Sequence, residues 1–273
     1  MQPEQYLNDV RTELGRDRER RFPLPGAATA PGCIQLDHVD LSFDRPVLDD
    51  LTMTVREGET LLILGESGTG KSTILKLILR LLLPDAGTIQ VFGREITDLP
   101  FENVLEMRRH IGMVFQNSAL FDSMTVYENV AYPLRENTEK DEAGIERTVR
   151  EKLEFVDLVP DQVMDQLPAE LSGGMRKRVG VARAIATNPE IVLYDEPTAG
   201  LDPLTVVTII DLIKKLQREL GVTSVLVTHD LRAGFKVASR VNLLREGRVT
   251  FEGTPEEFVA AKDPYIRAFI NAS

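Results

Sequence analysis

The sequence predicts a layered α/β fold in which helices cover a parallel sheet. EIVLYDE (190–196) and TSVLVTHD (223–230) are short apolar runs bounded by polar residues, which is typical of strands buried on both faces of such a sheet. TVVTIIDLIKKLQREL lies between them and has the apolar periodicity of a helix. Because strand, helix and strand alternate in this way, we expect an α/β layered core.

The N-terminal region, residues 1–32, is expected to be an extension and linker separate from the main domain at 33–273. Tyr6, Val10 and Leu14 have the spacing of a thin apolar stripe on a short docking helix, and FPLPGAATAPG then has the composition of a flexible linker. A disordered tail is the alternative for the same residues, and the pattern does not decide between the two.

From Ile34 onward, the expected elements follow in order. IQLDHVDLSF predicts a strand, and LTMTVREGETLLILG predicts two more on either side of its REG turn. STILKLILRLL (72–82) predicts a helix, GTIQVFG and HIGMVFQ predict strands, and the pattern from 117 to about 187 indicates a helical subdomain. RVNLLREGRVTFEG predicts a hairpin, and TPEE (254–257) predicts a helix start with a capping box and a proline at its first position.

The composition limits the classes of protein to which the chain can belong. Its 273 residues, 42% hydrophobic and 27% charged, are typical of a globular protein, and no apolar run is long enough to predict a membrane-spanning helix. The N-terminus has no apolar segment of a secretory signal, and Cys33 is the single cysteine, so we expect a reducing cytoplasm. The net charge of −11 argues against a general nucleic-acid binder.

The segment GESGTGKST (65–73) fits the pattern G-x-x-x-x-G-K-[ST], and it follows an expected strand and opens an expected helix. In that setting the glycines let successive backbone N–H groups turn toward a triphosphate, Lys71 reaches the β- and γ-phosphates, and the Ser72 hydroxyl is placed for Mg²⁺. The expected ATP-binding residues are Gly65, Glu66, Ser67, Gly68, Thr69, Gly70, Lys71, Ser72 and Thr73.

Two acidic residues end the buried run IVLYDE. A phosphate-binding loop of this kind needs a carboxylate to hold magnesium, and Asp195 has that place, while Glu196 can polarise the attacking water. His229 follows the next buried strand, at the edge where α/β sheets bind ligands. His38 and His110 have no such setting, and we interpret them as surface or hairpin residues.

A second anion cradle is predicted at LSGGMRKRVGVA (171–182). Ser172, Gly173 and Gly174 open an expected helix, whose N-terminus attracts anions. The basic cluster RKR (176–178) follows at once. For RKR, as for RDRERR in the N-terminal region, a solvated surface run is the alternative.

With LSGGM upstream of IVLYDEPTAGLDP and followed later by TH at 228–229, residues 34–255 resemble an ATP-binding cassette (ABC) ATPase. The resemblance implies a P-loop core with an antiparallel β-subdomain and a helical subdomain, and a head-to-tail homodimer that binds ATP and Mg²⁺. It implies that Gln116 touches magnesium and the attacking water, and that His229 contacts the γ-phosphate. It further implies that Ser172, Gly173, Gly174 and Asp202 act in trans, on the ATP or at the interface of the second copy.

The sequence departs from the family pattern beside the first strand. The resemblance implies an aromatic residue that stacks on adenine two positions beyond the phenylalanine of that strand, and SFDRP has Arg45 there. A guanidinium plane can stack on a purine, so Arg45 is the expected substitute.

Within the family, QNSALFDSMTVYENVAYPLRE (116–136), LSGGM followed by RKR, and GTPEEF with DPYIRAFI resemble the Mla-type ATPases of MCE-protein phospholipid transporters. This implies a peripheral homodimer on the cytoplasmic face of a bacterial inner membrane, bound to a permease and acting with an MCE-domain protein, without nucleic acid. Two alternatives stay open: a soluble cassette without a permease, for example of the iron–sulfur assembly type, and a module that binds ATP without hydrolysing it.

Overall fold

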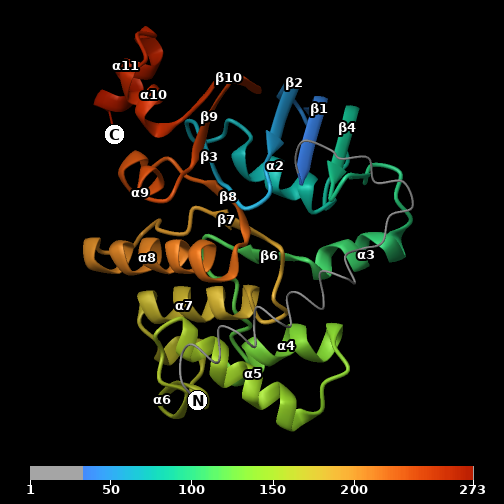
Figure 1. The fold of residues 1–273 in the computed structure, drawn as a ribbon, viewed down its shortest axis with the longest axis vertical. Coiled ribbons are helices and arrows are strands. Elements are labelled where there is room, and N and C mark those ends of the chain that lie inside the picture. Colours follow the sequence, from blue (N-terminus) through green and yellow to red (C-terminus); the bar gives the residue numbers. More distant parts are fainter. Residues whose placement is uncertain (1–32, 273) are drawn as a thin grey trace.

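The computed structural model describes residues 33–272 (Figure 1). The predicted N-terminal extension and linker at 1–32, with its docking helix, lies outside the described residues, as does Ser273. Over the described range the chain forms two sheets and a set of covering helices, so the predicted α/β fold is confirmed. No helix among these residues is long and apolar enough to cross a membrane.

A six-stranded sheet forms the centre of the molecule, in the order β10-β9-β3-β8-β7-β6. Its neighbouring strands pair in parallel from β9 to β6, and β10 pairs antiparallel with β9 at one edge. The strands are β3 (Thr60–Leu64), β6 (Ile111–Val114), β7 (Ile191–Asp195), β8 (Thr223–Val227), β9 (Arg240–Arg245) and β10 (Arg248–Gly253).

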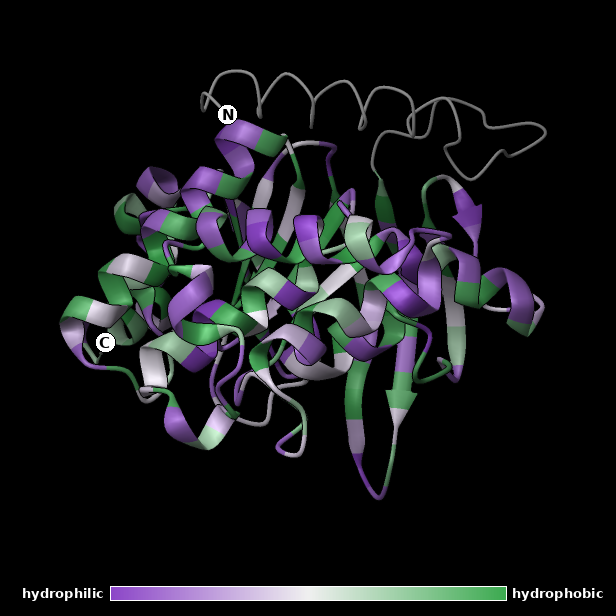
Figure 2. Cartoon of the chain, turned by 90° about the horizontal axis from the view of Figure 1, so that it is seen from below, coloured by the Kyte–Doolittle hydropathy of each residue, from purple (hydrophilic) through white to green (hydrophobic). Residues whose placement is uncertain are grey.

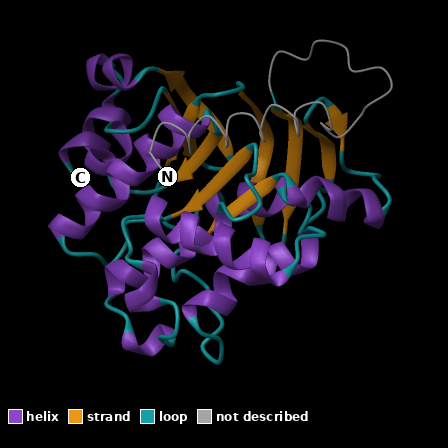
Figure 3. Ribbon diagram, turned by 60° about the horizontal axis from the view of Figure 1, so that its bottom comes forward, coloured by secondary structure: helices purple, strands orange, loops and turns teal. Residues whose placement is uncertain are grey.

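An antiparallel sheet of order β2-β1-β4-β5 lies beside it (Figure 3). It consists of β1 (Ile34–Ser42), β2 (Pro46–Val55), β4 (Ala86–Val91) and β5 (Arg94–Glu95). The turn after β2 leads directly into β3 of the central sheet, as the REG turn predicts.

The helices cover the central sheet on both faces. α4, α5, α6 and α7 gather at the lower end of Figure 1, beyond α8, and they fall within the region predicted to be helical. The helices are α2 (Lys71–Ile78), α3 (Phe101–Arg109), α4 (Val126–Asn137), α5 (Glu142–Phe155), α6 (Pro160–Val163), α7 (Gly173–Ala184), α8 (Pro203–Leu220), α9 (Leu231–Phe235), α10 (Pro255–Ala260) and α11 (Pro264–Asn271), with a 3₁₀ turn at Pro168–Glu170.

Two apolar cores lie on opposite faces of the central sheet. Successive residues of β3 alternate between them: Leu62 and Leu64 pack into one, and Leu61 and Ile63 into the other. The same alternation runs through β7 and β8, because side chains of a strand point to opposite faces in turn. The covering helices carry both hydrophilic and hydrophobic residues (Figure 2), which is typical of amphipathic helices packed on a buried sheet.

Some elements differ from the expectation. The helix expected at 72–82 ends at Ile78, and Arg80 has a left-handed φ of 51°, which the helix cannot continue through. The short helices α3 and α9 were not evident in the sequence. His110, expected at the surface or in a hairpin, is the C-cap residue of α3, and its side chain is only 22% exposed. Its ring lies edge-on to that of Phe92, and its Nδ1 lies 3.4 Å from Glu190 Oε1.

Candidate functional site

The predicted catalytic and phosphate-binding residues meet at the carboxyl edge of the central sheet. The parallel strands β3, β6, β7 and β8 all end there, and their last residues are followed by Gly65, Phe115, Glu196 and Thr228. Ligands of α/β sheets bind at this edge because the loops that leave the strands converge there.

The loop after β3 wraps into the start of α2. Gly70 has a left-handed φ of 100°, and a Cβ there would approach the side chain of Leu48 to 3.0 Å and that of Val47 to 3.1 Å. The loop therefore packs against the start of β2, and only glycine fits at this position. Glu66, Ser67 and Gly68 stay exposed at its tip, where a ligand can reach the backbone.

Lys71 is nearly buried at the first turn of α2, and its Nζ donates to the carbonyls of Gly65 and Glu66, each at 2.8 Å. Burial lowers the pKa of Lys71, and the charges of Glu196 and Asp195 oppose that shift. The ammonium therefore lies inside the curve of its own loop and within the field of both acids.

Ser72 and Asp195 come from different elements and lie one hydrogen bond apart. The Ser72 Oγ donates to Asp195 Oδ1 at 2.8 Å, which joins the start of α2 to the end of β7. A hydroxyl and a carboxylate are hard oxygen ligands, the type that Mg²⁺ prefers. Residues 33–272 hold no group of three or more His, Cys, Asp or Glu that could bind a metal. The oxygens of Ser72 and Asp195 fit Mg²⁺, an ion that proteins often bind through one or two oxygens together with substrate phosphates.

Glu196 lies beside this pair and is held by two neighbours. Its Oε2 accepts from the Thr228 hydroxyl at 2.8 Å, and its Oε1 lies 2.9 Å from His229 Nδ1. The Glu196 side chain is 13% exposed, whereas that of His229 is 62% exposed. Glu196 also has a left-handed φ of 46°, an uncommon backbone state for a residue with a side chain, and such states cluster at functional sites.

Gln116 lies exposed two residues beyond β6, on the loop that leads to α4. Its main-chain carbonyl accepts a hydrogen bond from Lys177 of α7. Lys177 is nearly buried, and burial lowers its pKa while Asp195 and Glu196 oppose the shift. The sequence alone does not distinguish Lys177 from the neighbouring Arg176 and Arg178, so this contact was not predicted.

The second cradle lies at the N-terminus of α7. Ser172 caps the helix by accepting from the backbone N–H of Met175 at 3.2 Å, and Ser172 and Gly173 are exposed. A Cβ on Gly174 would approach Thr205 of α8 to 2.7 Å. Thr205 in turn donates its hydroxyl to Asp202, the N-cap of α8, at 2.5 Å. The structure therefore joins Ser172, Gly174 and Asp202 in one surface.

The loop between β1 and β2 carries Arg45. Arg45 is exposed, and Val47, two residues further on, packs against Gly70 of the phosphate-binding loop. Phe43 lies on the same loop with 60% of its surface exposed. Because bases stack on aromatic rings, Phe43 is a second stacking candidate on this loop, which was not predicted from the sequence.

The C-terminal helix α11 reaches the phosphate-binding loop. The Tyr265 hydroxyl donates to Glu66 Oε1 at 2.9 Å, and the Arg245 guanidinium lies 4.3 Å from the centre of the Tyr265 ring. This contact joins residues 199 positions apart, so no local pattern predicts it.

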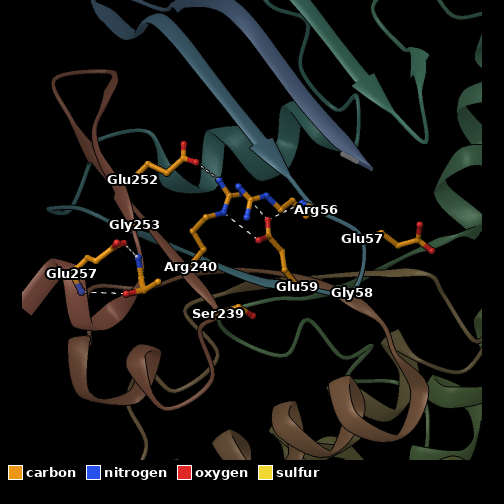
Figure 4. A pocket seen from close by; sticks show the side chains of 10 residues that line it. Arg56, Glu57, Gly58, Glu59, Ser239, Arg240, Glu252, Gly253 and Glu257 are labelled. Carbon is orange, nitrogen blue, oxygen red and sulfur yellow. Dashed lines mark hydrogen bonds and ion pairs between the residues drawn. The ribbon is translucent and has the colours of Figure 1, made fainter. Parts of the chain in front are cut away.

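A separate pocket of about 500 Å³ opens at the amino edge of the central sheet (Figure 4). Arg240, at the start of β9, is central to it, and its guanidinium pairs with Glu59 and Glu252 and donates to the carbonyl of Thr54. Figure 4 shows these side chains pointing toward one another. None of the predicted site residues lines this pocket.

Comparison with known proteins places the chain in a family. A protein-family model described as ABC transporter matches residues 48–199 of this chain. The intermembrane phospholipid transport system ATP-binding protein MlaF of Escherichia coli is 38% identical over 239 residues, which cover 86% of this chain and 88% of that protein. A probable ribonucleotide transport ATP-binding protein, mkl, of Mycobacterium tuberculosis is 39% identical over 82% of this chain.

The chain spans 62% of the length of mkl. This chain is also 42% identical to the methionine import ATP-binding protein MetN of Bifidobacterium longum. That match covers 82% of this chain and 55% of MetN. A dimeric ATP-binding cassette, solved in a post-hydrolysis state with ADP and Pi, matches 81% of this chain and 98% of its own with a TM-score of 0.75 and 33% identity. The chain therefore belongs to the ABC transporter family, as an ATP-binding cassette ATPase that uses ATP with Mg²⁺.

Proposed function

We propose that this chain is the ATP-hydrolysing subunit of a bacterial ABC transporter that moves phospholipid between the inner and outer membranes. It acts as a homodimer on the cytoplasmic face of the inner membrane, bound to a permease, in a complex that includes an MCE-domain lipid-binding protein. The observation that carries the lipid assignment is the match to MlaF over most of both chains, 86% of this one and 88% of the other. The MetN match has higher identity but spans 55% of that protein.

The phosphate-binding loop and the two acids divide the work on ATP. Lys71 exchanges the carbonyls of Gly65 and Glu66 for oxygens of the β- and γ-phosphates, since an ammonium binds a phosphate more strongly than a carbonyl. Ser72, Asp195 and Gln116 hold Mg²⁺, which when bound neutralises charge on the phosphate oxygens.

Glu196 and His229 act on the water and the γ-phosphate. The Glu196 carboxylate accepts a proton as the water oxygen bonds to the γ-phosphorus, and the bond from that phosphorus to the β–γ bridging oxygen breaks, so that ADP and phosphate leave. Thr228 and His229 hold both carboxylate oxygens of Glu196 and fix its orientation. The exposed face of His229 is free to contact the γ-phosphate.

The ATP site is completed by a second copy. Ser172, Gly173, Gly174 and Asp202 lie together at exposed helix N-termini, where they bind a γ-phosphate presented by the partner chain and line the interface. The cassette of 33% identity that was solved as a dimer with ADP and Pi supports the dimeric state that this arrangement needs.

Adenine stacks on the loop between β1 and β2, against Arg45 with Phe43 beside it. Both side chains are exposed, and the loop is anchored to Gly70 through Val47. Because stacking on a base is worth about 1–3 kcal/mol, Arg45→Ala and Phe43→Ala separate the two groups by their effect on ATP affinity in a calorimetric titration. If neither variant weakens binding, adenine does not stack here.

The permease docks on the exposed aromatic surface beside Gln116, which comprises Phe115, Phe121 and Tyr132. These side chains are 39%, 43% and 42% exposed, and the rings of Phe121 and Tyr132 lie 5.2 Å apart. Tyr132 belongs to AYPLRE on α4, where Ala131 and Leu134 are buried. An apolar patch of this kind is typical of a protein contact.

The net charge of −11 opposes direct binding of the chain to anionic lipid, so the contact with the permease recruits the chain to the membrane.

Co-purification from detergent-solubilised membranes tests the proposal. We expect the tagged full chain to retain a permease and an MCE-domain protein, and phospholipid to stimulate the ATPase activity of that complex. Phe121→Asp should release the permease, and the matched control Val259→Asp, at an exposed apolar residue of α10, should not. A permease without an MCE-domain protein, together with stimulation by methionine, would instead favour an importer like MetN. Recovery of no permease would favour a cassette that works alone.

A further inference from the structure

One face of α7 grips the main chain of the loop that carries Gln116. Lys177 donates its ammonium to the Gln116 carbonyl. Six residues further along the helix, Arg183 donates to the carbonyls of Ser118 at 2.9 Å and Ala119 at 2.8 Å. Basic side chains of one helix thus hold three carbonyls within residues 116–119.

The grip needs a close approach between the helix and the loop. Gly180 lies between Lys177 and Arg183 on α7, and a Cβ there would come within 3.2 Å of the Ser118 Cβ. Ser118 and Ala119 also have left-handed φ angles of 61° and 45°, a backbone state that persists only where the surroundings enforce it. The contacts from α7 supply that enforcement.

The far end of the loop is tied as firmly. The side chain of Asn129, fully buried on α4, accepts from the backbone N–H of Phe121 at 2.8 Å and donates to the carbonyl of Phe121 at 3.1 Å. Hydrogen bonds from α7 restrain the backbone of residues 116–119, and those from α4 restrain the backbone of Phe121. We therefore expect a shift of α7 to move the backbone of Gln116.

The three neighbouring basic residues of RKR serve different partners. Arg176 donates to the Leu171 carbonyl at 2.6 Å, and Arg178 donates to the Asp157 carbonyl at 2.6 Å, both within the helical region. Lys177 alone of the three turns to the Gln116 loop, and it is nearly buried there. A buried ammonium is costly unless it is hydrogen-bonded, so this contact is a specific one.

We propose that Lys177 and Arg183 make α7 a rigid link between two ATP sites of the homodimer. The N-terminus of α7 carries Ser172, Gly173 and Gly174, which receive the partner's ATP, and the same helix sets the position of Gln116 at the chain's own site. Lys177 is therefore a positioning residue for hydrolysis. This inference rests on the roles given to Gln116 and Ser172 in the proposed function, and it is independent of the cargo.

Steady-state ATPase measurements on the full chain test the link. Lys177→Met removes the donor, and we expect kcat to fall by about ten- to a hundredfold while KM for ATP changes little, because a charge-assisted hydrogen bond of about 1.5–3 kcal/mol is lost from Gln116 and not from the phosphate-binding loop. Lys177→Arg retains a charged donor and should recover most of kcat. Arg178→Met, which loses a contact on the far side of the helix, is the matched control and should retain wild-type kcat. Equal losses in Lys177→Met and Arg178→Met would overturn the proposal.

A double variant shows whether Lys177 acts through Gln116. If it does, Lys177→Met combined with Gln116→Ala is no slower than Gln116→Ala alone, since the side chain being positioned is already gone. If the losses of kcat in the two single variants instead multiply in the double variant, Lys177 does not act through Gln116, and the proposal is overturned. If Gln116→Ala keeps full turnover, the role proposed for Gln116 fails. If Lys177→Met is slow in that case, Lys177 does not act by positioning Gln116, and this proposal is overturned as well.

Should Lys177→Met fail to fold, as judged by circular dichroism and thermal unfolding, Arg183→Lys tests the same grip at the other carbonyls. A lysine puts a single ammonium in place of the planar fork whose two nitrogens donate to Ser118 and Ala119, so we expect a partial loss of kcat and a lower Hill coefficient for ATP. Unchanged kcat and cooperativity in a folded Arg183→Lys would overturn the proposal.

Discussion

The two edges of the central sheet both gather charged side chains, but they use them differently. At the amino edge, Arg240 is 8% exposed and Glu59 9% exposed, and the guanidinium has its donors taken by Glu59, Glu252 and a carbonyl. At the carboxyl edge, His229 stays 62% exposed, and Lys71 bonds to carbonyls of its own loop. The ion pairs of the amino-edge pocket are made within the protein and stabilise the fold. The charged and polar groups of the carboxyl-edge site can still bind a ligand.

The largest difference between the edges is expected from Glu196→Gln. Loss of the general base should lower kcat by about 10²–10⁴-fold while ATP binding persists, because the amide keeps the shape of the side chain and loses its basicity. Phosphate release measures turnover, and gel filtration with ATP should show a trapped dimer. Turnover within a few-fold of the parent chain, or a monomer alone with ATP, would place the chemistry elsewhere.

At the amino edge, we expect Arg240→Met to lower the stability of the fold, in contrast to Glu196→Gln, and to leave ATP binding unchanged. Removing one partner of a buried ion pair leaves Glu59 unpaired, so we expect the free energy of unfolding to fall by about 3–5 kcal/mol. Denaturant titration measures this loss, and KM for ATP should stay unchanged. Arg56→Met, at an exposed residue of the same pocket, is the control and should cost little. A raised KM in Arg240→Met would show that the pocket belongs to the ATP site.

At the carboxyl edge, Lys71→Ala should weaken ATP binding without a comparable loss of stability. The ammonium contributes charge-assisted hydrogen bonds to phosphate, and the affinity should fall by about ten- to a hundredfold. An equilibrium titration checks the affinity, with thermal unfolding beside it. Undiminished ATP binding would contradict the assignment of residues 65–73 as the phosphate-binding loop.

The smallest effect concerns Cys33, near the amino edge. Burial, with the charges of Glu57 and Glu59, raises the pKa of its thiol to about 11. The unfolded chain releases this proton at lower pH than the native chain, so between pH about 9 and 11 the thiol makes the free energy of unfolding fall as pH rises. A thiol-reactive disulfide reagent should accordingly react slowly with the native chain at pH 9. Reaction at the rate of a free thiol would show that Cys33 is not shielded.

The sequence predicted the carboxyl edge better than the contacts that support it. Strand ends and the glycine-rich loop are local patterns, so the sequence alone sufficed to place Lys71, Ser72, Asp195, Glu196 and His229 at one sheet edge. Lys177 could not be distinguished from Arg176 and Arg178, because helix pattern alone did not show which of three adjacent basic residues faces the core. The Tyr265 contact with Glu66 joins elements 199 residues apart, and only the packing of α11 reveals it.

Complementation between two inactive variants tests most directly whether each ATP site is built from two chains. Lys71→Ala damages the phosphate-binding loop, and Ser172→Arg fills the cradle at the start of α7. In a mixed head-to-tail dimer, one site receives both damaged parts and the other receives neither, so mixing the two purified variants should restore ATP hydrolysis well above that of either alone. A mixture no more active than its separate components would contradict a site shared between two copies.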